Sequence, residues 1–182
     1  MALLQWRGEY RASDTLSFGF NTYYRHFGQH LVDGNTTDVD TCENDVSELC
    51  LEGGDDYPGD ALYDASGNPV SASVLPAGAT PGETDFTRTN SDTFGATVEM
   101  TSKDALFGHD NFFTAGASID DGHTGYSAYC ELGALLDSLR VAGVDVIIDQ
   151  SLSPTASPPI ETPVDVSARN IYSGFYANDV FS

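Results

Sequence analysis

Apolar and polar residues alternate along several segments of the chain. In TFGATVEMTS (93–102), residues of one parity are apolar and those of the other are polar or glycine; the apolar ones are Phe94, Ala96, Val98 and Met100. Successive side chains of a β-strand point to opposite faces, so this segment predicts a strand with one apolar and one polar face. In a soluble sandwich the apolar face packs on a protein core, whereas in an outer-membrane barrel it faces lipid.

Strand-like patterns recur along the chain, and their connections alternate between short and long. They predict antiparallel strands at about 3–12, 16–32, 93–103, 111–120 and 169–180, with short turns at 13–15 and 104–110. The stretches 33–92 and 121–167 show no sustained alternation and are predicted to be long loops. Within the second loop, YSAYCELGALL and VAGVDVIID are expected to form a hairpin or to extend a strand beyond the bilayer.

The arrangement of the connections favours a membrane barrel over a soluble sandwich. Barrels of the outer membrane have short turns on one side and long loops on the other, and their strands span the bilayer with about 9–11 residues. A structureless connection of 60 residues is uncommon inside a compact soluble domain. We therefore expect residues 1–182 to be all-β, an antiparallel meander that forms part of a transmembrane β-barrel with two long extracellular loops. Tyr23, Tyr24 and Phe27 would be either a membrane-interface belt or an aromatic core corner.

The charge of the chain narrows its partners. Seven basic and 28 acidic residues give a net charge of −21, which excludes a nucleic-acid surface and argues against binding to an anionic membrane surface. A hydrophobic content of 40% and an aromatic content of 11% are too high for a disordered acidic tail. No apolar run is long enough for a transmembrane helix. Arg7 and Glu9 interrupt the apolar start before a signal peptide can form.

Three cysteines leave several interpretations open. Cys42 and Cys50 enclose seven residues of a polar stretch, and the favoured interpretation is a disulfide that closes this short loop. Zinc would need two more ligands, and the nearest histidines lie on another predicted element. Free thiols would suit a cytosolic protein. Cys130 is expected to be a small buried or lipid-facing residue rather than a catalytic thiol.

No motif in the sequence indicates catalysis. The acidic stretch TTDVDTCENDVSE lacks the EF-hand spacing, and a solvated loop is the simpler interpretation of it than a Ca²⁺ site. No triad order or phosphate-binding glycine loop occurs, so we expect no enzyme, no cofactor and no metal. Glu99 and Arg25 are expected to face the barrel lumen. The candidates for contact with a ligand lie in the first long loop and are Asp55, Asp56, Tyr57, Asp60 and Tyr63.

Four segments together resemble the barrel of TonB-dependent outer-membrane receptors. They are NTYYRHFGQHLVDGNTTDVDTCEND, DFTRTNSDTFGATVEMTS, LFGHDNFFTAGASID and NIYSGFYANDVFS. The resemblance implies a barrel of 22 strands with a plug in its lumen, which imports iron–siderophore complexes, cobalamin or other scarce solutes across the outer membrane. Its partners would be outer-membrane lipid, the remaining strands and plug, and TonB only through the missing N-terminal part.

The chain departs from this family pattern in ways that indicate a fragment. No plug and no TonB box precede the strands, and family members continue beyond DVFS. Five spanning strands cannot close such a barrel, so we expect an internal piece of a receptor that transports nothing by itself. The sequence does not name the solute. The alternatives are a small surface or outer-membrane β-protein that binds ligands or cells through its acidic loops, and a secreted β-rich enzyme.

Overall fold

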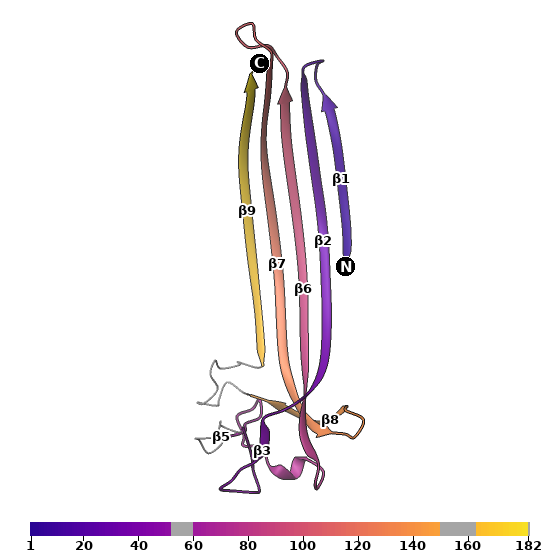
Figure 1. Ribbon diagram of the computed structural model, residues 1–182, viewed down its shortest axis with the longest axis vertical. Coiled ribbons are helices and arrows are strands. Elements are labelled where there is room, and N and C mark those ends of the chain that lie inside the picture. The colour runs from indigo at the N-terminus through magenta and orange to yellow at the C-terminus, as the bar shows by residue number, and fades with distance from the viewer. Residues whose placement is uncertain (52–59, 150–162, 182) are drawn as a thin grey trace. The chain divides into compact units, whose positions relative to one another are not determined.

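The structure is a computed structural model that describes residues 1–51, 60–149 and 163–181. These residues form an all-β, antiparallel fold without an α-helix (Figure 1). The larger sheet has the order β1 (Ala2–Arg11), β2 (Leu16–Thr36), β6 (Thr80–Ser102), β7 (Asn111–Leu135) and β8 (Val141–Ile148), and β9 (Val164–Phe181) also pairs with β7. This sheet is open and does not close into a barrel.

A second, small sheet lies within the segment between β2 and β6. It contains β3 (Val39–Thr41), β4 (Leu49–Leu51) and β5 (Asp60–Ala61), followed by a single 3-10 turn, η1 (Ala72–Val74). The chain divides into two compact units. The first is Met1–Gly28, Asn90–Gly125 and Ser167–Ser182, and the second is Gln29–Thr89 and Tyr126–Val166. Strands β2, β6, β7 and β9 each contribute residues to both.

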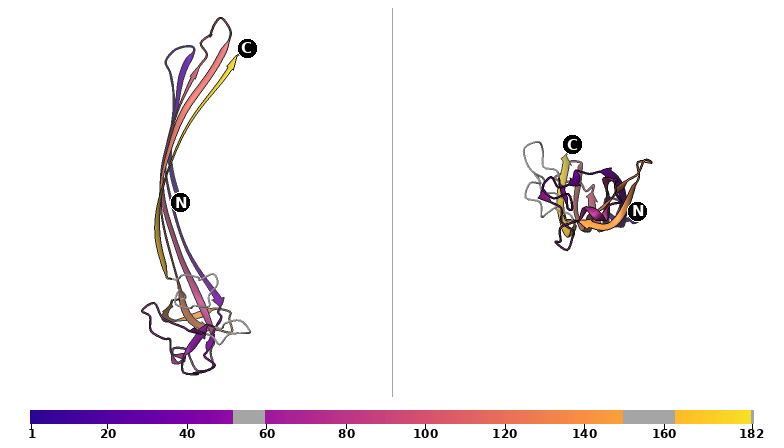
Figure 2. Two further views of the ribbon diagram at one scale, coloured as in Figure 1. Left: turned by 90° about the vertical axis from the view of Figure 1, so that its left-hand side faces the viewer. Right: turned by 90° about the horizontal axis from the view of Figure 1, so that it is seen from below.

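The first unit is a meander whose two short turns lie at the same end of the sheet (Figure 1). The β1–β2 turn and the β6–β7 turn contact each other, since the Thr15 hydroxyl donates a hydrogen bond to Asp104 at 2.5 Å and the Lys103 N–H donates to the Thr15 carbonyl at 2.8 Å. The strand ends agree with the turns predicted at 13–15 and 104–110. Figure 2 shows that these strands bend and twist along their length.

The first unit has a single layer. Strand β1 pairs with β2 without interruption from Ala2↔His26 to Arg11↔Ser17. All buried hydrophobic residues of the described chain belong to the second unit. The described residues of the first unit therefore form no hydrophobic core of their own, and pairing between neighbouring strands holds the unit together.

The second unit has a compact hydrophobic core. Leu49, Leu62, Leu132 and Ile148 are fully buried at its centre, and Val39, Val70 and Cys130 join the same cluster. Strands β7 and β8 form a hairpin with a register shift between Leu132 and Gly133. Backbone hydrogen bonds tie the small sheet to neighbouring segments; for example, the N–H of Leu49 donates to the carbonyl of Val70 at 2.9 Å.

The two predicted long loops are partly wrong. Strand β2 continues to Thr36, and β6 begins at Thr80, well before the predicted start at 93. Residues 80–92 are mostly polar on both parities, so they show no alternation, although their four β-branched threonines favour a strand. In the second stretch β7 continues to Leu135 and then turns back into β8. A longer strand and a hairpin, which were expected as alternatives, therefore both occur in this stretch.

Candidate functional site

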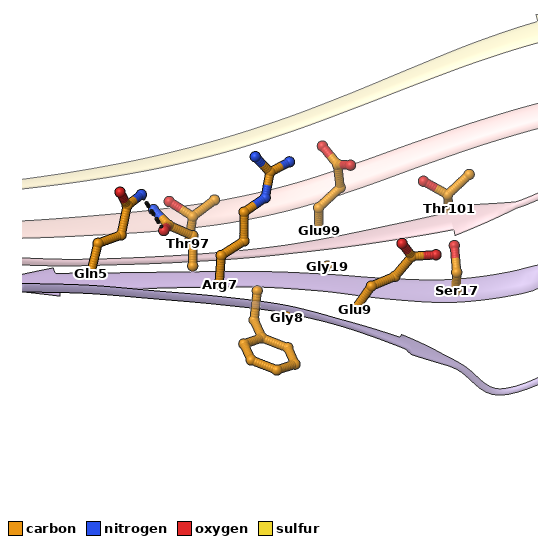
Figure 3. A pocket seen from close by; sticks show the side chains of 11 residues that line it. Gln5, Arg7, Gly8, Glu9, Ser17, Gly19, Thr97, Glu99 and Thr101 are labelled. Carbon is orange, nitrogen blue, oxygen red and sulfur yellow. Dashed lines mark hydrogen bonds between the residues drawn. The ribbon is translucent and has the colours of Figure 1, made fainter.

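The polar face of the first unit carries a broad hollow. It has a volume of about 620 Å³ and is lined by β1, β2 and β6. Figure 3 shows Gln5, Arg7, Glu9, Thr97 and Glu99 projecting to one side of the sheet. The polar parities of three neighbouring strands thus share one face, as the alternation predicts.

A second hollow continues this polar face across β2, β6, β7 and β9. Its volume is about 340 Å³, and its lining includes Arg25, Asp120, Asn170 and Tyr172. Arg25 and Glu99, the two residues predicted to face the lumen, therefore line hollows on the same face of the sheet. Both hollows are open, and the lining of the larger one is mainly polar, which suits contact with water or a polar partner rather than with hydrocarbon.

Two tyrosines cross the polar face over glycines. The Tyr23 hydroxyl on β2 donates to Asp120 on β7, and its ring passes over Gly95 of the intervening strand β6. A Cβ at Gly95 would overlap this ring. The tyrosine therefore links three strands, and its position requires a residue without a side chain beneath it.

We call each such tyrosine, with the glycine beneath it and the carboxylate that it binds, a clamp. The second clamp reaches from β9 toward β6, whereas the first reaches from β2 toward β7. The Tyr176 hydroxyl on β9 donates to Glu99 on β6, and its ring passes over Gly116 of β7. The two clamps together connect β2, β6, β7 and β9 on one face. The second clamp also shows which residues of β7 and β9 lie on the polar face, because Tyr176 and Gly116 must lie on the same side of the sheet as Glu99.

The opposite face of the first unit is apolar and uncovered. Alternation places Trp6, Phe94, Ile119 and Phe175 there, together with the other residues of their parities. The exposed fractions are 65% for Trp6, 51% for Phe94, 46% for Ile119 and 87% for Phe175. An apolar face this extensive on a single-layered sheet indicates a surface that something apolar covers.

A polar row bounds the apolar face toward one end of the strands. His26 Nδ1 lies 2.8 Å from Asp92 Oδ1, and the Tyr24 hydroxyl also donates to Asp92. The hydrogen bond between the Ser91 and Thr124 hydroxyls at 2.9 Å places the next residues, Asp92 and His123, opposite each other on the other face. The row therefore runs from β2 across β6 to β7.

Strand β9 continues this polar row. The Arg169 guanidinium donates two hydrogen bonds to the Asp121 carboxylate, from Nε at 2.8 Å and from a terminal nitrogen at 2.5 Å. Both residues have the parity of the apolar face. At the other end of the strands, the turns supply polar residues such as Asp14, Lys103 and Asp104. The apolar face is thus a band between two polar margins.

The second unit contains the predicted disulfide. Cys42 and Cys50 are bonded, with their Cα atoms 5.0 Å apart, within the range that disulfides require. The acidic stretch around them forms ordinary turn contacts: Asp45 accepts hydrogen bonds from the N–H and the hydroxyl of Ser47, at 2.9 and 2.6 Å. These bonds lower the pKa of the Asp45 carboxyl.

The predicted ligand-contacting residues are only partly described. Asp55, Asp56 and Tyr57 lie outside the residues that the structure describes. Asp60 begins β5 and pairs with Leu51, and Tyr63 forms an isolated bridge with Pro69. Asp60 and Tyr63 therefore stay candidates for ligand contact that no observation in the structure tests.

A cluster that the sequence did not reveal lies in the second unit. Glu83 and Asp85 of β6 and Cys130 of β7 offer one oxygen each and a sulfur, and these atoms lie within 4.8 Å of one another. The Thr37 hydroxyl donates to Glu83 at 2.8 Å, and the Asn35 amide donates to Asp85 at 3.1 Å. Residues 80–92 were predicted to be loop, so the common facing of Glu83 and Asp85, two residues apart on a strand, was missed.

Burial and neighbouring negative charges raise pKa values in this cluster. Burial is the main cause that raises the pKa of Glu83, and the charge of Asp85 adds to it. The pKa of the Cys130 thiol is also raised, by burial and by the negative charges of Glu83 and Asp85. Cys130 is 1% exposed, which agrees with the expectation of a small buried residue.

Comparison with known proteins gives no relative. No protein family, curated protein or solved structure matches the chain. Among the described residues, no helix has the length and apolar character needed to cross a membrane. The function must therefore be inferred from the sheet and its two faces.

Proposed function

We propose that the chain is part of the barrel of a TonB-dependent outer-membrane receptor, which imports a scarce solute such as an iron–siderophore complex. The proposal joins the sequence resemblance to one structural observation. The first unit is a single-layered antiparallel sheet with an uncovered apolar face and a polar, hollowed face. Lipid outside and a water-filled lumen inside are the two environments that such a sheet fits.

The height of the apolar band supports this interpretation. On β6 the band runs from Asp92 in the polar row to Ser102 beside the turn, and Ser102 is ten residues after Asp92. At about 3.3 Å per residue this is about 33 Å along the strand. A strand tilt of roughly 40° reduces it to about 25 Å along the membrane normal, which is the height of the apolar band in outer-membrane barrels.

The open edges of the sheet also fit a piece of a larger barrel. In hydrocarbon an unpaired edge strand is costly, because its N–H and carbonyl groups find no water. The edges of β1 and β9 would pair with the remaining strands of the receptor, and the polar face would surround its plug. The acidic second unit would then belong to the extracellular loops that meet the solute.

Uptake measurements test this function. The gene that encodes the full-length protein is deleted, and cells are given radiolabelled ferric siderophores and cobalamin one at a time. The proposal expects uptake of one of them to fall to the level of cells without energised inner membranes, and to return on complementation. Unchanged uptake of every compound would contradict transport of these solutes.

A second candidate function rests on the second unit. Its own hydrophobic core and the Cys42–Cys50 disulfide give it the features of a domain that keeps its shape in an exported environment. The chain would then be a small surface or outer-membrane β-protein that binds ligands through its acidic loops, without transport or catalysis. Ligand binding to the second unit without any effect of gene deletion on uptake would favour this alternative.

A further inference from the structure

The three side chains of Glu83, Asp85 and Cys130 have the donor atoms of a metal site. Within the described part of the chain they are the one group of three such residues whose ligand atoms lie so close together. We propose that this cluster binds a Zn²⁺ ion through one thiolate sulfur and two carboxylate oxygens. The proposal concerns the second unit alone and does not depend on the transport function.

The cysteine shows that the cluster is more than a group of surface acids. Cys130 is almost fully buried, and its thiol points toward the two carboxylates, which are its polar neighbours. Cys130 also belongs to the hydrophobic cluster of the second unit, so it lies where that core meets two carboxylates. Here the sulfur lies on the side of the strand pair where Glu83 and Asp85 project.

A cation would balance the negative charges around the cluster. The charged groups that act on Glu83 are Asp85 and Asp38, both negative, and those that act on Cys130 are Glu83 and Asp85. No basic side chain is among them. Negative groups that are partly buried together are normally paired with a cation or a metal ion. The arginines of the unit are Arg88 and Arg140, and neither is among the charged groups that act on Glu83 or Cys130.

The carboxylates are already held in place from the other side. The Thr37 hydroxyl donates to Glu83 at 2.8 Å and the Asn35 amide donates to Asp85 at 3.1 Å. Carboxylates that bind metals are commonly oriented by such hydrogen bonds, which keep one oxygen directed at the ion. Asn35 lies at the end of β2 and Thr37 follows the strand directly, so a third strand reaches the site.

The dimensions and the donor types favour zinc. Tetrahedral bonds of about 2.3 Å to sulfur and about 2.1 Å to oxygen place ligand atoms roughly 3.5 Å apart. Side-chain rotations that close the present separations, all within 4.8 Å, by roughly 1 Å would form this geometry. Ca²⁺ and Mg²⁺ prefer oxygen ligands throughout, whereas a thiolate with carboxylates suits Zn²⁺. Water would fill the fourth position, and the thiol proton would pass to solvent as the zinc–sulfur bond forms.

Metal titration of the whole chain tests the proposal. The 182-residue chain is refolded in detergent micelles, stripped with EDTA and titrated with Zn²⁺ against a chromophoric chelator. We expect one equivalent to bind. With Co²⁺ in place of Zn²⁺, we expect a thiolate-to-cobalt charge-transfer band in the near ultraviolet, and we expect Cys130→Ser to abolish it.

Variants separate this site from nonspecific binding by acids. Glu83→Gln and Asp85→Asn should each weaken Zn²⁺ binding by at least about tenfold, and Thr37→Val by about tenfold through loss of orientation. Glu43→Gln and Asp137→Asn remove exposed carboxylates of the same unit and should leave the affinity unchanged. Circular dichroism checks that each variant keeps its β-structure.

Two results would overturn the proposal. One is the absence of Zn²⁺ binding at micromolar concentrations in the unsubstituted chain. The other is an affinity that Cys130→Ser and Glu83→Gln leave unaltered. If a variant fails to fold, alkylation of the Cys130 thiol is measured in the unsubstituted chain with and without Zn²⁺. Slower alkylation in the presence of Zn²⁺ supports the site, and an equal rate refutes it. None of these measurements involves uptake, so their failure is distinct from failure of the proposed function.

Discussion

Val98 and Thr97 give a matched pair for testing which face of the sheet meets lipid. They are neighbours on β6, so they lie at the same depth, but their side chains point to opposite faces. Val98 is 51% exposed on the apolar face, and Thr97 lines the hollow of the polar face. Val98 lies six residues from Asp92 and four from Ser102, close to the middle of the apolar band.

The size of the expected effect follows from this depth. Arginine on the lipid face costs about 2–4 kcal/mol at the bilayer midplane of a barrel. Since 1.4 kcal/mol corresponds to a factor of ten, Val98→Arg should lower the equilibrium constant for folding into the membrane by roughly 30- to 800-fold. Thr97→Arg places the same charge in a polar, water-accessible hollow, and its cost should be below about 1 kcal/mol.

Folding of the full-length protein into phospholipid vesicles, titrated with urea, measures both free energies. We expect a large loss of folding free energy for Val98→Arg and a small one for Thr97→Arg. Equal losses, or a larger loss for Thr97→Arg, would refute the lipid-facing assignment. The apolar parity would then pack against protein, as in a soluble sandwich.

Three further predictions concern the clamps, the disulfide and the buried acid. Gly95→Ala should destabilise the sheet by about 1–3 kcal/mol in urea unfolding, because its Cβ would overlap the tyrosine ring above it, whereas Gly19→Ala, whose Cβ meets its nearest neighbour at 4.0 Å, should be tolerated. Reduction of Cys42–Cys50 should lower the stability of the second unit by about 2.5 kcal/mol, measured as faster proteolysis of that unit, and an unchanged rate would contradict it. Burial raises the pKa of Glu83. In metal-free protein the protonated Glu83 therefore contributes stability at low pH, and this contribution is lost as pH rises through the raised pKa. Glu83→Gln should remove this decline in the free energy of unfolding, and a decline that persists in full would contradict the assignment to Glu83.

The strands of the first unit were predictable because one physical rule decides them. Each strand has one apolar and one polar face, so the residue types at positions such as Phe94, Thr97 and Ile119 show in the sequence which face each side chain takes. The turns at 13–15 and 104–110 are short and polar, and they end the alternation clearly. Their common end in the structure agrees with the prediction from their lengths.

The second unit was much harder to predict. Residues 80–92 form a strand in which both faces are polar, so no period of two appears, and threonine content alone is a weak signal. Strands β3, β4 and β5 are two or three residues long and are held by pairing with distant residues, such as Val39 with Leu51. A local pattern cannot reveal such pairing.

The candidate sites divide in the same way. The pairing of Cys42 with Cys50 could be favoured from their short separation. The cluster of Glu83, Asp85 and Cys130 could not, because it depends on the register between β6 and β7, which joins residues 45 or more positions apart. The glycines beneath Tyr23 and Tyr176 likewise have meaning only once the neighbouring strand is in place.

Spin-label accessibility along β6 distinguishes an apolar face that meets lipid from one that packs on protein. Single cysteines are placed at successive positions from 93 to 101 in the full-length protein, with Cys130 replaced by alanine, and nitroxide labels are examined in phospholipid vesicles. We expect high accessibility to oxygen at Phe94, Ala96, Val98 and Met100, and high accessibility to a water-soluble nickel complex at the positions between them. An absence of this period of two, or oxygen accessibility that peaks at the polar positions, would contradict a lipid-facing apolar face.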